Sequence, residues 1–156
     1  MQKKLKTALI NTQLLHWYHR QIKPKNHVAI EIIWKNVKIL ITKRWPHKFL
    51  EGMWKFPGGK VENNETSKEC LAREMVAELG IIVKIHSFIK VIKRSYSHCY
   101  ITMDTYHCSI ISGEPVAIQC AEYILISPTE LDDLPFPSAS HKLFDTVKHY
   151  EKNIAI

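Results

Sequence analysis

The spacing of apolar residues changes along the chain and predicts where strands and helices lie. Apolar and polar positions alternate in "VAIEIIW" and again in "VKILITKR", as in half-buried strands, and Lys35 and Asn36 between them are turn candidates. Residues 27–44 are therefore predicted to form a β-hairpin. The segments "IIVKIHSFIKVIKRSY" and "YITMDTYHCSII" predict two further strands around a Ser-His turn, and "YILIS" predicts a short last strand.

Helix signals lie between and after these strands. Residues 67–79 are predicted to be helical because Thr66 and Glu69 have the spacing of a capping box and Gly80 supplies a stop. The expected apolar stripe of this helix is Leu71, Met75, Val76 and Leu79. Ser127, Pro128 and Glu130 predict the start of a short helix, and residues 141–152 predict a closing helix that packs through Leu143, Phe144, Val147 and Tyr150.

The first 26 residues differ from the rest and predict a basic accessory arm. Leu5, Leu9, Leu14, Leu15 and Tyr18 have roughly helical spacing, and "KPKN" then ends any helix. Many lysines lie in this segment, namely Lys3, Lys4, Lys6, Lys23 and Lys25. We expect residues 1–26 to form a helical extension and residues 27–156 to form one domain.

Composition limits the classes of protein that fit. A chain of 156 residues with 46% hydrophobic and 24% charged residues can build one globular core. Its apolar runs are far shorter than the roughly 18 to 20 residues that span a bilayer, so we expect a cytoplasmic protein with no membrane partner. The four cysteines lack a C-x-x-C spacing and are expected to be buried thiols. A formal charge of +7 favours polyanionic partners such as nucleotides or nucleic acid, although a solvated basic arm also explains it.

The long segment "RWPHKFLEGMWKFPGG" and the helix after it carry the candidate chemistry. A loop of this length in a compact domain is usually functional. Gly59 is followed after five residues by Glu65, then after seven by Arg73 and Glu74, and then by Glu78, Gly80 and Ile81. This 23-residue pattern resembles the Nudix box at every fixed position except one. The flanks resemble MutT-like hydrolases, and later segments also resemble the Nudix-like C-terminal domain of adenine glycosylases of the MutY type.

The resemblance implies a fold and a metal site. The expected fold is α/β, a Nudix α/β/α sandwich with a mixed β-sheet and a loop–helix catalytic motif. Magnesium, with manganese as an alternative, needs hard oxygen ligands, and positions i and i+4 of a helix present Glu74 and Glu78 on one face. By resemblance Glu78 is a metal ligand, Glu74 is a ligand or a base, and the Gly58 carbonyl is a ligand. Arg73 is expected to pair with Glu65 and hold the loop on the helix.

Two departures from the family pattern affect the expected metal site. Ala77 stands where the pattern has a glutamate that binds metal. Gln119 aligns with a further metal-binding glutamate, for which Glu122, three residues later, is the expected substitute. Fewer carboxylates weaken metal affinity and water activation, so activity is expected to be impaired.

Other residues are expected to bind the nucleotide. By resemblance Arg44 and Lys60 contact phosphates, and the turn of Tyr96, Ser97 and His98 contacts an oxidised guanine. Ser140 stands where MutT-like chains have an asparagine that reads the purine edge. A plain surface charge at Arg44, a local turn at Ser97 and a helix N-cap at Ser140 remain alternatives.

The function expected from these residues is magnesium-dependent hydrolysis of an oxidised purine nucleoside triphosphate to the monophosphate and pyrophosphate. The first alternative is a non-catalytic module that binds oxidised guanine in DNA. A second is a Nudix enzyme for another nucleoside diphosphate derivative. The nucleotide is the expected partner, and the protein is expected to be a monomer or a homodimer.

Overall fold

A computed structural model describes residues 12–17 and 23–154. Residues 12–17 are helical and exposed, which agrees with the predicted accessory helix in this short segment. Leu5, Leu9 and Tyr18 of that prediction lie outside the described residues. Strand β1 begins at Lys25, so the last two residues of the expected linker already belong to the sheet. The division into an arm and a domain stays a prediction.

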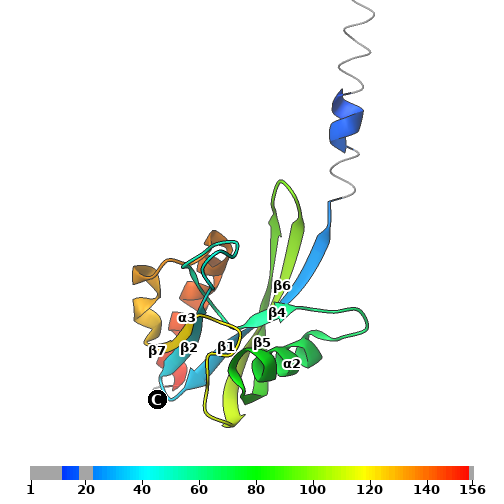
Figure 1. The fold of residues 1–156 in the computed structure, drawn as a ribbon. Helices are drawn as coiled ribbons and strands as arrows, with labels where there is room; N and C mark the ends of the chain where they lie inside the picture. Colours follow the sequence, from blue (N-terminus) through cyan, green and yellow to red (C-terminus); the bar gives the residue numbers. More distant parts are fainter. Residues whose placement is uncertain (1–11, 18–22, 155–156) are drawn as a thin grey trace, which may run out of the picture.

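One mixed sheet of seven strands forms the centre of the molecule (Figure 1). Its strands are β1 (Lys25–Lys35), β2 (Lys38–Lys43), β3 (Trp54–Lys55), β4 (Gly58–Lys60), β5 (Ile82–Ser95), β6 (Tyr100–Ser112) and β7 (Glu122–Ile126). The order is β3-β2-β1-β6-β5, while β4 pairs with β1 and β7 with β2. Strands β1 and β6 are parallel and every other pairing is antiparallel.

Both predicted strand pairs are confirmed. The turn between β1 and β2 lies at residues 36–37, where Asn36 takes a φ of 58°, a conformation that asparagine tolerates better than most residues. Strands β5 and β6 pair along almost their whole length with three register shifts. This long hairpin rises beside β1 in Figure 1.

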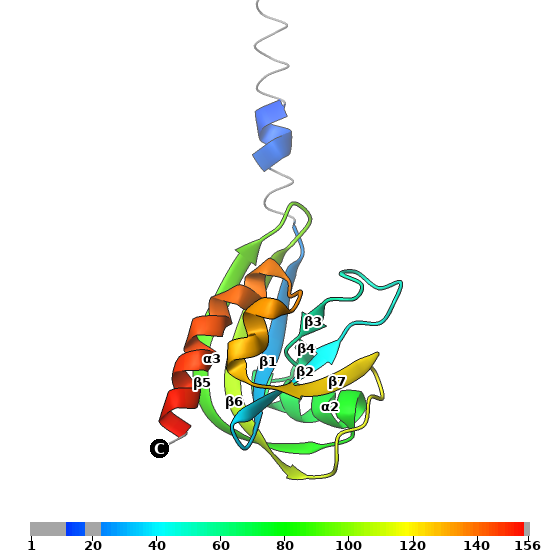
Figure 2. The same ribbon diagram turned by 90° about the vertical axis from the view of Figure 1, so that its left-hand side faces the viewer.

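Helices α2 (Ser67–Leu79) and α3 (His141–Ile154) lie on opposite sides of the sheet, as Figures 1 and 2 show from two directions. Alternation along β1 explains this arrangement, because Ile33 packs with α2 residues and Ile32 packs with α3 residues. The result is the expected α/β/α sandwich. The four cysteines are buried, as predicted. Within the described residues, no helix is long and apolar enough to cross a membrane.

Helix α2 has the predicted bounds and caps. Thr66 and Glu69 form the capping box, and Gly80 takes the left-handed C-cap conformation with a φ of 66°. Leu71, Met75 and Leu79 are buried, but Val76 is 55% exposed, so its assignment to the apolar stripe was wrong. Each residue advances about 100° around a helix, and the contact stripe is narrow enough here that Val76, next to Met75, points outward.

The prediction of one long loop over residues 44–59 was incomplete, because the segment contains β3 and the start of β4. These strands are only two and three residues long and form by pairing with β2 and β1, so no local pattern marks them. The short helix at Pro128–Asp133 (η1) is a 3-10 helix, and a second one, η2 (Ser138–Ser140), precedes α3.

Candidate active site

Two adjacent glycines bring the loop close to the sheet and to α2. A Cβ on Gly58 would stand 2.1 Å from the Ala29 carbonyl oxygen, and the residue has a φ of 144°. A Cβ on Gly59 would stand 2.4 Å from the carboxyl carbon of Glu74. Only glycine therefore allows β4 to pair with β1 while the Glu74 carboxylate lies against the same strand.

Arg73 ties this loop to the helix, as predicted. Its Nε donates to Glu65 Oε1 at 2.6 Å, and its Nη2 donates to Glu65 Oε2 at 3.0 Å and to the Lys60 carbonyl at 3.1 Å. Its Nη1 donates to Glu74 Oε1 at 2.5 Å. The Arg73 hydrogen bond is the main reason that the pKa of Glu65 falls to about 2, so Glu65 stays charged and the clamp holds near neutral pH.

Glu78 is the buried carboxylate of the site. It is 2% exposed, and its Oε1 accepts a hydrogen bond from Thr42 Oγ1 at 3.2 Å and an ion pair from Lys55 Nζ at 2.8 Å. Its Oε2 is buried and has no hydrogen-bond partner among the described residues. A buried acceptor without a donor is costly unless another group satisfies it.

A second buried carboxyl group, that of Glu31 on β1, was not predicted from the sequence. This residue is fully buried, and apart from the Cys108 thiol neither carboxyl oxygen has a hydrogen-bond partner in the described part of the chain. Burial, with a further contribution from the charge of Glu78, raises the pKa of Glu31 to about 8. The available signal was a lone glutamate inside the apolar strand "VAIEIIW".

The donor set suits a hard divalent ion but is reduced. The Glu74 carboxylate lies against Gly59 of β4, and Glu78, one turn later on α2, offers a second carboxylate. The unpartnered Oε2 of Glu78 is the observation that favours a bound cation. Ala77 contributes no oxygen. Among the described residues, no three His, Cys, Asp or Glu side chains are grouped closely enough to hold a metal ion.

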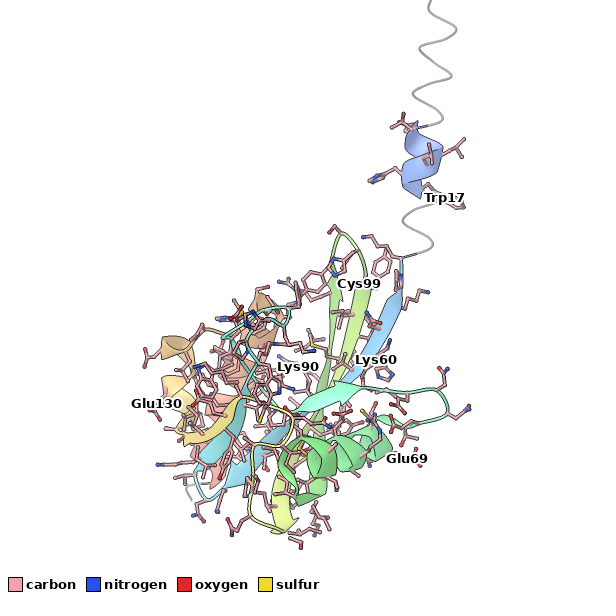
Figure 3. The ribbon with its side chains drawn as sticks, viewed as in Figure 1. Trp17, Lys60, Glu69, Lys90, Cys99 and Glu130 are labelled. Atoms are coloured by element: carbon pink, nitrogen blue, oxygen red, sulfur yellow. The ribbon has the colours of Figure 1, made fainter. Side chains whose placement is uncertain are left out.

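A cavity of about 350 Å³ opens next to these residues. Its lining includes five of the expected substrate-binding residues: Arg44, Lys60, Tyr96, His98 and Ser140. Gly58, Gly59 and Lys55 also line it, so the loop connects the carboxylates to the cavity. Figure 3 labels Lys60 on β4 and Cys99 near the end of the β5–β6 hairpin, two of the elements that border the cavity.

The cavity has an apolar floor and an aromatic rim. Val28, Ile30, Ile101 and Met103 from β1 and β6 contribute apolar surface. At the rim, the His98 ring lies 6.0 Å from Tyr96 and 6.5 Å from Phe49, which is 73% exposed. Such surfaces stack well with a planar base. Phe49 was not predicted, although its place in an aromatic loop was a usable signal.

The remaining predicted residues lie outside this lining. Ser97 does not line the cavity, although it belongs to the same turn as Tyr96 and His98. Glu122 is half exposed and pairs with Lys43 at 3.0 Å. Gln119 lines a neighbouring hollow together with Arg44 and Lys55.

Arg44 lies between the cavity and the carboxylates. Burial lowers the pKa of its guanidinium, whereas the charge of Glu78 opposes that shift, and its Nε has no hydrogen-bond partner within the described residues. A half-buried guanidinium whose Nε lacks an acceptor favours an anionic ligand.

Known proteins with similar sequences and structures agree with this geometry. An 8-oxo-dGTP diphosphatase of Buchnera aphidicola is 32% identical over 76% of this chain and 92% of its own length. A CTP pyrophosphohydrolase of Escherichia coli is 30% identical over 76% of this chain and 87% of its own. The solution structure of the DNA mismatch repair protein MutT, a Nudix family hydrolase, from methicillin-resistant Staphylococcus aureus superposes with a TM-score of 0.69. It is 29% identical, over 83% of this chain and 99% of that one. The family model described as NUDIX domain matches residues 28–146, and the chain therefore belongs to the NUDIX domain family.

Proposed function

We propose that this protein hydrolyses an oxidised purine nucleoside triphosphate of the 8-oxo-dGTP type to the monophosphate and pyrophosphate. The observation that carries the proposal is a single cavity that has aromatic side chains at its rim and is also lined by Arg44, Lys60 and the glycines Gly58 and Gly59 of β4. That arrangement fits a base at the rim and phosphates beside Glu74 and Glu78. The relatives named as 8-oxo-dGTP diphosphatases support the same substrate class. The proposed compartment is the cytoplasm, where free nucleotides are found.

The chain's own residues would divide the work as follows. Tyr96 and His98 stack on the base, and Ser140 offers a hydroxyl to its edge. Arg44 and Lys60 bind phosphate oxygens. Glu74 is the proposed acceptor of the proton from the attacking water, and Arg73 orients it through the 2.5 Å bond.

Magnesium is the proposed cofactor. Glu74, Glu78 and the Gly58 carbonyl would hold it, and the ion would neutralise charge on the phosphates and make a bound water more acidic.

The test is pyrophosphate release from 8-oxo-dGTP, dGTP, dATP and CTP, each with and without magnesium. We expect magnesium-dependent release that is fastest with 8-oxo-dGTP. Faster release from CTP or another normal nucleotide would contradict the proposed substrate and favour a different Nudix activity, for which the CTP pyrophosphohydrolase relative is a precedent.

A binding module for oxidised guanine in DNA is the second candidate. The observation that favours it is the ion pair of Glu78 with Lys55, together with a site of only two carboxylates. Binding of a DNA oligonucleotide that contains 8-oxoguanine, without pyrophosphate release from any triphosphate, would establish this candidate instead.

A further inference from the structure

A lysine of the chain itself binds the carboxylate of Glu78. Lys55 Nζ lies 2.8 Å from Glu78 Oε1, the same oxygen that accepts the hydrogen bond from Thr42. Thr42 and Lys55 are direct partners across β2 and β3, so both side chains lie on the face of the sheet that α2 covers. The ion pair is thus built by strand register.

Burial makes this contact hard to replace with solvent. The Glu78 side chain is only 3% exposed and that of Lys55 is 24% exposed. A carboxylate in such a place needs a positive partner, and the ammonium supplies one charge and a short hydrogen bond. A divalent ion that approached Glu78 would meet the repulsion of Lys55 and would find one of the two oxygens already bound.

The charges around Glu78 lead to the same conclusion. The cations Arg44, Lys55, Lys60 and Arg73 surround the site. The carboxylates beside them are Glu62, Glu65, Glu74 and Glu78, and the first three already lie within ion-pair distance of Arg73. The chain's own cations therefore balance its carboxylates without any metal ion.

We propose that Lys55 serves as an internal cation at Glu78 and thereby keeps divalent ions from binding tightly to this site. The inference rests on the proposed function for the role of the site. It deepens that function because it names Lys55 as the residue that sets the metal requirement. Ala77, which supplies no carboxylate, and Lys55, which supplies an ammonium, then act in the same direction. Each makes the charge at the metal face of α2 less negative than a glutamate at position 77 and a neutral residue at position 55 would make it.

The test is direct Mn²⁺ binding without nucleotide, measured from the electron paramagnetic resonance signal of the free ion. Lys55→Met should bind Mn²⁺ about tenfold or more tightly than the parent protein, since one repelling charge is gone and both Glu78 oxygens are free. Lys38→Met is the matched control, because it removes one positive charge from the exposed opposite end of β2. It should change Mn²⁺ affinity by less than about twofold.

Two outcomes would overturn the inference. One is Mn²⁺ affinity of Lys55→Met that equals or falls below that of the parent. The other concerns a Lys55→Met variant that does not fold without metal, because the substitution leaves the buried Glu78 carboxylate unpaired. Mn²⁺ should then restore its thermal unfolding transition at concentrations that leave the parent Tm unchanged, and failure to do so refutes the role of Lys55. The Mn²⁺ titration contains no nucleotide and is therefore independent of the pyrophosphate-release assay. If that assay showed no hydrolysis, the proposed function would be contradicted, and the Mn²⁺ titration would still decide on Lys55.

Discussion

Glu78 shows at the residue scale how the site depends on one buried charge. Its Oε1 is held by Thr42 and Lys55, and its Oε2 remains without a partner among the described residues. Its charge acts to raise the pKa of both Glu31 and Arg44, although burial lowers the pKa of Arg44 overall. A single side chain therefore links α2 to β1, β2 and the loop.

Glu78→Gln should reduce pyrophosphate release by about 100-fold or more, because a metal site with two carboxylates loses half of its negative charge. The amide has nearly the same shape, so the thermal unfolding transition should remain cooperative. Glu114→Gln, which changes an exposed carboxylate between β6 and β7, is the control and should keep parent activity. Parent-like turnover in Glu78→Gln would remove Glu78 from the site.

Residues with local partners were predictable from sequence, and residues with distant partners were not. Thr66, Glu69 and Gly80 act within one helical turn, so their spacing alone predicts the caps. The pairing of Lys55 with Glu78 requires the register of β2 and β3 and the docking of α2, none of which leaves a short-range pattern. Glu31 was equally unpredictable. Its sequence context shows a polar residue inside an apolar strand, but not that the charge of Glu78 acts on it.

At the scale of elements, the β5–β6 hairpin brings the predicted base-binding turn to the cavity. Tyr96 N donates to the Cys99 carbonyl at 2.8 Å, which closes the turn and orients Tyr96 and His98 at the rim. Arg94 Nη2 donates to Ser138 Oγ at 2.8 Å, so the hairpin is also fixed to η2. The turn and Ser140 therefore border one cavity from opposite elements.

Tyr96→Ala should weaken nucleotide affinity by about 1 to 3 kcal/mol, the range for stacking of a base on an aromatic side chain. Isothermal titration with a nucleotide in the absence of turnover measures the loss. Phe88→Ala is the control, since Phe88 is an exposed aromatic residue of the same hairpin that does not line the cavity. Equal affinities of all three proteins would leave Tyr96 as part of a structural turn.

At the scale of the whole molecule, the sheet separates the carboxylates from the cavity floor, and residues 54–60 connect the two. The carboxylates come from the α2 side, and the cavity floor comes from the side that α3 covers. Residues 54–60 cross between these sides at the edge of the sheet, which lets Lys55 contact Glu78 and also line the cavity. The alternation of apolar and polar residues in β1 predicted the layers of the fold. The crossing depends on β3 and β4, and these two strands were not predicted from the sequence.

Stability of the whole molecule should depend on the protonation of Glu31. Its pKa is raised from 4.5 to about 8 in the folded state, mainly by burial, so the folded state binds more protons than the unfolded state between these values. The free energy of unfolding should therefore fall as pH rises from 4.5 to about 8 and then level off. Glu31→Gln should remove this decline, and urea denaturation across that pH interval measures the difference.

His107 provides the internal comparison for that experiment. Burial lowers its pKa to about 4, so its contribution to stability falls in the opposite direction, as pH drops below 6.5. Both proteins share this effect, and subtracting the two profiles isolates Glu31. A constant difference between parent and Glu31→Gln across the interval would show that Glu31 titrates normally.

The substitution Ala77→Glu tests whether the whole molecule is an impaired enzyme or a binding module. Ala77 is half buried on α2, three residues after Glu74 and outside the buried apolar contacts, so a glutamate there adds a third carboxylate with little effect on stability. For an impaired enzyme, the substitution should tighten magnesium binding and raise turnover of 8-oxo-dGTP, because more phosphate charge is neutralised at a given metal concentration. A magnesium titration of both proteins decides the matter. No hydrolysis in either protein would identify a binding module. Slower hydrolysis in the variant would mean that the parent site is already complete, through Glu122 or a water.

If Lys55 limits metal binding, the double variant Ala77→Glu, Lys55→Met should bind magnesium more tightly than either single variant, because both changes make the charge beside Glu78 more negative.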